Sequence, residues 1–110
     1  MKIGDYIRTD KGNISKIKWI SEQVTTLNEI KAGTYHLESG EIVHQYYGDT
    51  INSSSNILDL IEIGDYVNGL PVINIVEDGV ITLALFFKIA KENIKTIVTK
   101  EQFKEKEYEV

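Results

Sequence analysis

Two histidines, His36 and His44, have the spacing that most directly suggests chemistry. They flank Ser39-Gly40, which is typical of a hairpin turn. A two-residue loop would place His44 opposite Tyr35, whereas a three-residue loop would place His36 directly across from His44, with Glu38 nearby on the same face. Imidazole and carboxylate groups bind divalent metals, but no helical spacing or third certain ligand accompanies this pair. Ordinary surface or aromatic packing is therefore the favoured interpretation, and we predict no metal site.

Other catalytic patterns are equally weak in this sequence. The serines of 53–55 lie in a polar stretch without the glycines of a nucleophile elbow. The turns "ESGE" and "EDGV" carry acidic residues beside their glycines, which disfavours phosphate binding. The chain has no cysteine, so disulfides, thiol nucleophiles and cysteine-based metal sites are excluded. We expect a protein that is not an enzyme and has no cofactor.

The distribution of charge is more informative than the formal net charge of −5. Residues 32–87 contain no Lys or Arg, but they contain eight Asp and Glu. Such a segment should repel nucleic acid and anionic membranes and attract a basic protein surface. With nearby aromatic side chains added, the predicted partner-binding residues are Glu38, Glu41, Tyr46, Tyr47, Asp49, Glu77 and Asp78. The alternative interpretation is that an acidic chain is simply soluble.

A second functional hypothesis is a small-ligand binder that sequesters a signalling nucleotide in an aromatic pocket. An anion requires cations, so Arg8, Lys16 and Lys18 would have to converge with Trp19. A third hypothesis is a structural or assembly protein that oligomerises through the edges of its β-sheets. The aromatic residues could also only fill the core of a small β protein.

Strand-like segments separated by turns dominate the chain, which predicts a mainly β fold of one or two small SH3-like or β-barrel units built from hairpins. Alternation predicts that Ile17, Trp19 and Ser21 share one side of their strand, with Lys16, Lys18 and Ile20 on the other. Asn68-Gly69 is the strongest hairpin turn. Short helices are expected near 56–61, after Ser55 or Asn56, and near 99–106, where Thr99 and Gln102 resemble a capping box. Tyr108 to Val110 should form an edge strand.

The expected organisation is a β unit over 1–47, a linker over 48–56 and a second β unit over 57–110, or one continuous domain. The pentad Ile-Gly-Asp-Tyr-(Ile/Val) occurs at Ile3 and again at Ile63. Gly permits a sharp bend, Asp accepts hydrogen bonds from backbone amides, and the next residues enter a strand. We therefore interpret Asp5 and Asp65 as turn-builders, in a repeat that is either a duplication or a convergent strand start.

The stretches "NILDLIEIGDYVNG" (56–69) and "IVTKEQF" (97–103) resemble a group of short, uncharacterised proteins from phages and prophages of Gram-positive bacteria. The resemblance covers the C-terminal half and brings no catalytic residues. It implies an accessory protein that acts in the host cytoplasm, where such proteins bind and block host machinery. An inhibitor of a defence system, such as a CRISPR nuclease, is the function that this setting and the acidic segment together suggest. The longest apolar run, 80–87, is too short to span a bilayer.

Overall fold

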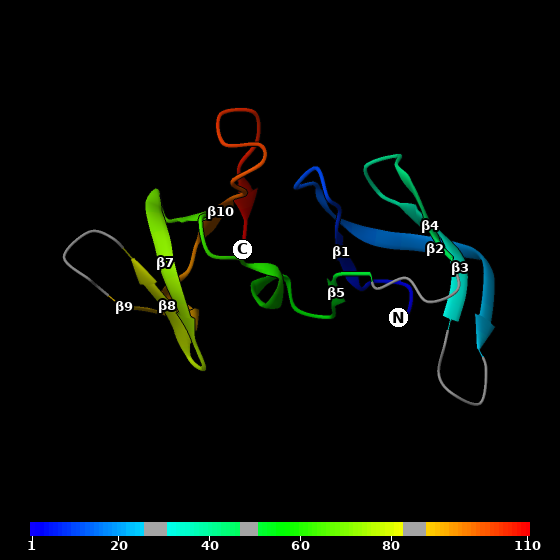
Figure 1. Cartoon of the computed structure of the whole chain (residues 1–110), viewed down its shortest axis with the longest axis horizontal. Coiled ribbons are helices and arrows are strands. Elements are labelled where there is room, and N and C mark those ends of the chain that lie inside the picture. Colours follow the sequence, from blue (N-terminus) through cyan, green and yellow to red (C-terminus); the bar gives the residue numbers. More distant parts are fainter. Residues whose placement is uncertain (26–30, 47–50, 83–87) are drawn as a thin grey trace. The chain divides into compact units, whose positions relative to one another are not determined.

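The computed structural model describes residues 1–25, 31–46, 51–82 and 88–110. These residues form antiparallel β structure in two compact units (Figure 1). Unit 1 comprises Met1–Thr9 and Ile14–Asn56, and unit 2 comprises Asp10–Asn13 and Ile57–Val110. The short turn Asp10–Asn13 therefore belongs to unit 2, although the strands that it joins belong to unit 1.

Unit 1 is a five-stranded sheet in the order β4-β3-β2-β1-β5. Its strands are β1 (Tyr6–Arg8), β2 (Ile14–Thr25), β3 (Lys31–Leu37), β4 (Ile42–Gln45) and β5 (Ser53–Ser54). The buried core consists of Ile7, Ile17, Tyr35 and Leu37, against which Met1, Ile20, Val43 and Ile51 pack. β5 lies inside the stretch 48–56 that the sequence suggested as a linker, and it pairs with β1.

Two irregularities in β2 change which side chains reach the core. The register against β3 shifts between Ile17 and Trp19 and again between Ile20 and Glu22, so Lys18 and Ser21 are extra residues. A bulge of this kind interrupts the two-residue alternation of a strand. Ile17 and Ile20 consequently pack in the core, whereas Trp19 is 46% exposed. The predicted sharing of one side by Ile17 and Trp19 is wrong for this reason.

The hairpin of β3 and β4 has neither register that the sequence suggested. His44 lies opposite Thr34, and His36 lies opposite Ile42. The amide of Leu37 donates to the carbonyl of Glu41, so a three-residue loop, 38–40, closes the hairpin one residue earlier than the three-residue loop that the sequence suggested, and Gly40 has a positive φ of 94°. The two imidazoles are therefore offset along the hairpin instead of facing each other.

Unit 2 is a six-stranded sheet in the order β11-β10-β6-β7-β8-β9. Its strands are β6 (Tyr66–Val67), β7 (Leu70–Val76), β8 (Gly79–Thr82), β9 (Lys88–Ala90), β10 (Thr96–Val98) and β11 (Tyr108–Glu109). Single 3₁₀ turns, η1 (Ile57–Leu60) and η3 (Lys91–Asn93), accompany it. Asn68 and Gly69 have φ values of 51° and 80°, which confirms the predicted tight turn. β11 confirms the predicted edge strand.

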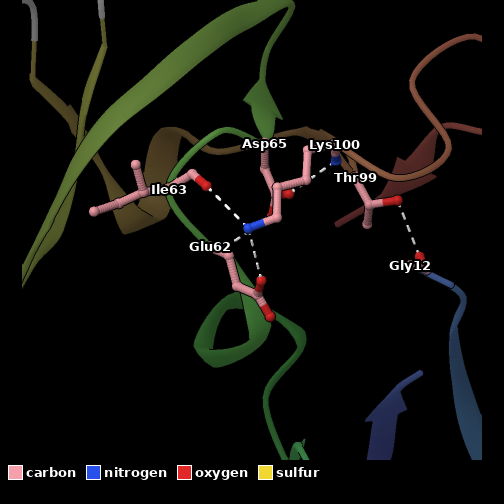
Figure 2. A network of polar contacts seen from close by, with 6 residues as sticks. All are labelled: Gly12, Glu62, Ile63, Asp65, Thr99 and Lys100. Atoms are coloured by element: carbon pink, nitrogen blue, oxygen red, sulfur yellow. Dashed lines mark hydrogen bonds and ion pairs between the residues drawn. The ribbon is translucent and has the colours of Figure 1, made fainter. Parts of the chain in front are cut away.

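The mainly β class is confirmed, with three corrections. Within the described ranges the two sheets do not close into a barrel, and no α-helix occurs. The helix expected near 56–61 is only the 3₁₀ turn η1. The helix expected near 99–106 is replaced by turns, because Thr99 is fully buried and its hydroxyl donates to the Gly12 carbonyl at 3.0 Å. Figure 2 shows the hydrogen bond between Thr99 and Gly12. Gln102 contacts Asn13 and Tyr108 through its side chain.

The two pentads form the same backbone turn. In the first, Gly4 donates its amide hydrogen to Ile17, Asp5 donates to Lys2, and Ile17 donates back to Asp5. In the second, the matching donors and acceptors are Gly64 to Val72, Asp65 to Glu62, and Val72 to Asp65. Both glycines have positive φ, 92° and 99°. The two sheets also share a local strand order. In unit 1, β1 lies between β2 and β5, and in unit 2, β6 lies between β7 and β10.

The second turn has an additional network of polar contacts, drawn in Figure 2. The Asp65 carboxylate accepts hydrogen bonds from the amides of Glu62 at 2.8 Å and Lys100 at 3.0 Å. The Lys100 ammonium donates to the Ile63 carbonyl at 3.3 Å and pairs with Glu62 at 3.1 Å. Asp65 is fully buried, which agrees with the interpretation of this residue as a turn-builder.

Candidate functional site

The strongest candidate site is the side of β2, β3 and β4 that is turned away from the core of unit 1, which we call the outer face. Directly opposite residues of an antiparallel sheet project on the same side, so the register assigns its members in rows. One row is Trp19, His36 and Ile42, and the next is Glu22, Thr34 and His44. A third begins with Val24 and Ala32, and Tyr46 lies beside them where the chain leaves β4.

The outer face is unusually apolar for an exposed surface. Its large side chains Trp19, Val24, Ile42 and Tyr46 are 46%, 53%, 52% and 67% exposed. Isolated exposed hydrophobic residues are common, but several that share one face indicate an interaction surface. The three rows contain no Lys or Arg and one carboxylate, Glu22, whereas the exposed Lys16 and Lys18 precede Trp19 in β2.

Stacking and hydrogen bonds fix both imidazoles on this face. The His36 ring stacks on Trp19 with a centroid distance of 3.8 Å and an interplanar angle of 7°. His36 Nε2 lies 3.0 Å from the Ser21 hydroxyl, which the second bulge of β2 brings within reach. His44 Nδ1 lies 3.3 Å from the Thr34 hydroxyl, and its ring centroid lies 6.2 Å from that of Tyr46. These contacts preorganise the His36 and His44 rings as flat π surfaces on the outer face.

A shallow hollow of about 190 Å³ opens between the second and third rows of the outer face. It is lined by Glu22, Val24, Ala32, Gly33, Thr34, His44, Gln45 and Tyr46. The hollow therefore combines a carboxylate, a hydroxyl and an aromatic ring. Such a combination accepts hydrogen bonds and offers a π face, and it suits a cationic group better than an anion.

Gly33, which lines this hollow, leaves room for the Tyr35 side chain on the other side of the sheet. A β-carbon at this position would lie 2.7 Å from the Tyr35 hydroxyl. That hydroxyl donates to Gln45 Oε1 at 2.8 Å on the core side of the sheet. Tyr35 is fully buried, so its hydrogen bond to Gln45 links β3 to β4 beneath the outer face.

The predicted partner-binding residues divide between the two units. Glu38, Glu41 and Tyr46 belong to unit 1, whereas Glu77 and Asp78 form the β7–β8 turn of unit 2. Glu38 is exposed and Glu41 is half-buried, with its carboxylate accepting from the Ser39 hydroxyl at 3.3 Å. Tyr47 and Asp49 lie outside the described residues.

Much of the acidic segment in unit 2 is paired with lysines that follow it in the chain. Lys88 contacts Asp78 at 2.6 Å, Lys91 contacts Asp59 at 3.9 Å, and Lys100 contacts Glu62 at 3.1 Å. The hydrogen bond and charge of Lys88 lower the pKa of Asp78 below its ordinary value. Folding therefore offsets part of the charge separation that is visible in the sequence.

The three cations of the nucleotide-binding hypothesis lie in different environments. Arg8 is only 4% exposed in β1. The Lys16 ammonium lies 5.4 Å from the centroid of the Tyr6 ring, and Lys18 is an exposed bulge residue of β2. Trp19 stacks on His36, so its nearest ring partner is an imidazole.

A larger hollow of about 560 Å³ occurs in unit 2, lined by Asn68, Leu70, Lys88, Ile89, Ala90 and Asn93. The Asn68 side chain has a structural role, because its Nδ2 donates to the Asn93 carbonyl at 2.9 Å and its Oδ1 accepts from the amides of Lys95 and Thr96. In the part of the chain that the structure describes, no three side chains of the types His, Cys, Asp or Glu come close enough together to hold a metal ion. No helix there is long and apolar enough to cross a membrane.

Comparison with protein families, curated proteins and solved structures found no match for this chain. Sequence reasoning selected Trp19, His36, His44 and Tyr46 as residues of interest, and the structure places all of them on one face. The prediction from the sequence did not include Glu22, Val24 and Ile42. The only signal for these residues is the strand register, which the bulges of β2 conceal.

Proposed function

We propose that this chain is a non-enzymatic protein-binding module that engages a basic surface of a partner protein through its outer face. The observation that carries the proposal is the gathering of four well-exposed side chains on one face, with Trp19 and Ile42 on one side of the row that contains Glu22, and with Val24 and Tyr46 on the other. Aromatic side chains in the centre of a patch contribute most to protein recognition. Their π faces also attract cationic side chains, so the surface favours a partner that presents Arg or Lys.

Electrostatics support the same partner class at longer range. The chain carries a net charge of −5, and exposed acids outside the outer face, such as Glu38 and Glu77, extend its negative field. Complementary charge speeds encounter and weakens with salt. The resemblance to phage and prophage proteins supplies the setting: an accessory protein in the host cytoplasm that blocks a host defence protein, of which a CRISPR nuclease with basic grooves is the leading example.

The test is capture of host proteins on the immobilised full chain at low and high salt. We expect one or more basic proteins to be retained by the native chain and lost in the double variant Trp19→Ala/Tyr46→Ala. Glu38→Lys and Glu77→Lys should weaken capture at low salt more than at high salt. Ile63→Ala is the matched control, because Ile63 is an exposed hydrophobic residue of unit 2 outside the outer face.

Circular dichroism of each variant separates loss of binding from loss of fold. Capture that is indifferent both to the Trp19 and Tyr46 substitutions and to ionic strength would overturn the proposal. Retention of acidic proteins only would overturn the assigned partner class.

A further inference from the structure

The geometry points to a specific role for the hollow between Glu22 and Tyr46: we propose that it receives an arginine side chain of the partner. This inference rests on the proposed function, because it names the partner group that the outer face recognises. It commits the hollow to a guanidinium group rather than to a lysine ammonium or a neutral side chain.

The first argument is the arrangement of donors and acceptors. Glu22, Thr34 and His44 lie opposite one another on three adjacent strands, so their side chains form a row across the hollow. A carboxylate at one end of the row and a hydroxyl in its middle are acceptors for the planar fork of a guanidinium group, whose nitrogens all donate.

The second argument is the π surface beside that row. Tyr46 is 67% exposed, and His44 stacks loosely on it at a centroid distance of 6.2 Å. A guanidinium group stacks on aromatic rings more readily than an ammonium group does, because it is planar and more weakly hydrated. Val24 and Ala32 supply apolar contacts for the aliphatic part of the arginine chain.

The third argument is charge and space. The residues that line the hollow include a carboxylate and no Lys or Arg, so the site selects a cation. The hollow is about 190 Å³, which is the scale of one side chain and well below that of a drug-sized ligand. It therefore accommodates an anchor residue of a larger interface rather than an independent ligand.

The test uses blocked tripeptides as probes of the hollow in the full chain. Ac-Gly-Arg-Gly-NH₂ is compared with the same peptides that carry lysine or the neutral isostere citrulline, by ¹H–¹⁵N NMR titration. We expect the arginine peptide to bind with a dissociation constant on the order of millimolar, as suits one anchor side chain. Shifts should concentrate at Thr34, His44 and Gln45, and the other two peptides should bind several-fold more weakly.

Two variants test the carboxylate and the aromatic ring of the site separately. Glu22→Gln removes the charge and should weaken the arginine peptide about five-fold. Tyr46→Leu keeps an apolar side chain but removes the ring, and it should weaken the arginine peptide more than the lysine peptide. Glu92→Gln is the control, since Glu92 is an exposed acid of unit 2 that does not line the hollow.

Equal binding of the arginine and lysine peptides, or binding that Glu22→Gln leaves unchanged, would overturn the inference. The absence of any shift would overturn it as well. The peptide titration and the capture experiment fail independently. If the arginine peptide did not bind but the Trp19/Tyr46 double variant still lost partner capture, the arginine site would be overturned and the proposed function would stand.

Discussion

At the scale of single residues, Asp5 and Asp65 occupy the same position in two copies of one turn but in different environments. Asp65 is fully buried and accepts two backbone hydrogen bonds, whereas Asp5 is half-buried and accepts one from the Lys2 amide at 3.1 Å. Hydrogen bonds to charged acceptors contribute more than neutral ones, and a buried donor left without a partner costs most. The two carboxylates should therefore differ in their contribution to stability.

We predict that Asp65→Ala lowers the free energy of unfolding by about 3 kcal/mol and Asp5→Ala by about 1 kcal/mol. Chemical denaturation followed by circular dichroism measures both values. Asp65→Asn is the informative intermediate, because it keeps one acceptor oxygen without the charge. Equal losses in the two alanine variants would contradict the difference that we draw between the two turns.

Asp78 offers a pH-dependent prediction. The hydrogen bond from Lys88, with the positive charge of that lysine, lowers the pKa of Asp78 in the folded protein. A lowered pKa means that the pair stabilises the fold at neutral pH and that its contribution disappears as the pH falls through the folded pKa. Both side chains are exposed, so the contribution to stability is small and screened by salt.

We expect Lys88→Ala to raise the pKa of Asp78 toward its ordinary value, as measured from the carboxyl chemical shift in an NMR titration. High salt should raise it in the same direction in the native chain. Lys95→Ala is the control, because the Lys95 ammonium contacts the Glu92 carbonyl rather than a carboxylate of the β7–β8 turn. An unchanged pKa in Lys88→Ala would show that another group lowers it.

At the scale of elements, the hairpins were predictable and the deviations from them were not. The Asn68-Gly69 turn follows from two residues that tolerate positive φ, and the pentad turns follow from Gly and Asp at fixed places. The bulges at Lys18 and Ser21 have no comparable signature, and they decide that Trp19 faces solvent. The helix expected after Thr99 does not form because the buried Thr99 hydroxyl donates to the carbonyl of Gly12, which is distant in the sequence, instead of capping a helix.

Close approach of two strands gives a prediction at this scale. A β-carbon on Gly79 would lie 2.1 Å from the Ile89 carbonyl oxygen of β9, a distance that requires the strands to move apart. We expect Gly79→Ala to destabilise the protein by about 3 kcal/mol. Gly40→Ala is the comparison, since Gly40 has a positive φ of 94° but nothing within 4 Å of the added carbon.

At Gly40 only the strain of a positive φ opposes an alanine, so Gly40→Ala should lower the free energy of unfolding by about 1 kcal/mol. Thermal unfolding of both variants provides the measurement. A smaller loss for Gly79→Ala than for Gly40→Ala would mean that β8 and β9 separate readily, which the ladder from Gly79 to Ile81 argues against.

At the scale of the whole molecule, the acidic segment of the sequence is divided between the units. Unit 1 contains five Lys and Arg against six Asp and Glu, whereas unit 2 contains seven against eleven. The candidate face thus lies on the nearly neutral unit, and most of the net charge lies on the other. Composition predicted an acidic protein that binds a partner. Only the strand register shows that the aromatic side chains and the Glu22 carboxylate share the outer face.

The division into units also has a consequence for isolated fragments, because the turn Asp10–Asn13 belongs to unit 2. A fragment of residues 57–110 lacks that turn, so the buried Thr99 hydroxyl loses the Gly12 carbonyl and Gln102 loses Asn13. Leaving a buried polar group without a partner costs about 1–3 kcal/mol. We therefore expect the fragment to be less stable than the same unit in the full chain.

Thr99→Val provides the decisive comparison, since it removes the hydroxyl with little change of volume. In the full chain it should lower the free energy of unfolding by about 1–2 kcal/mol, and in the fragment it should have almost no effect because the hydrogen bond is already absent. Denaturant unfolding of the four proteins measures this coupling. An equal loss in both backgrounds, or a fragment as stable as the intact unit, would show that residues 57–110 are sufficient without the turn.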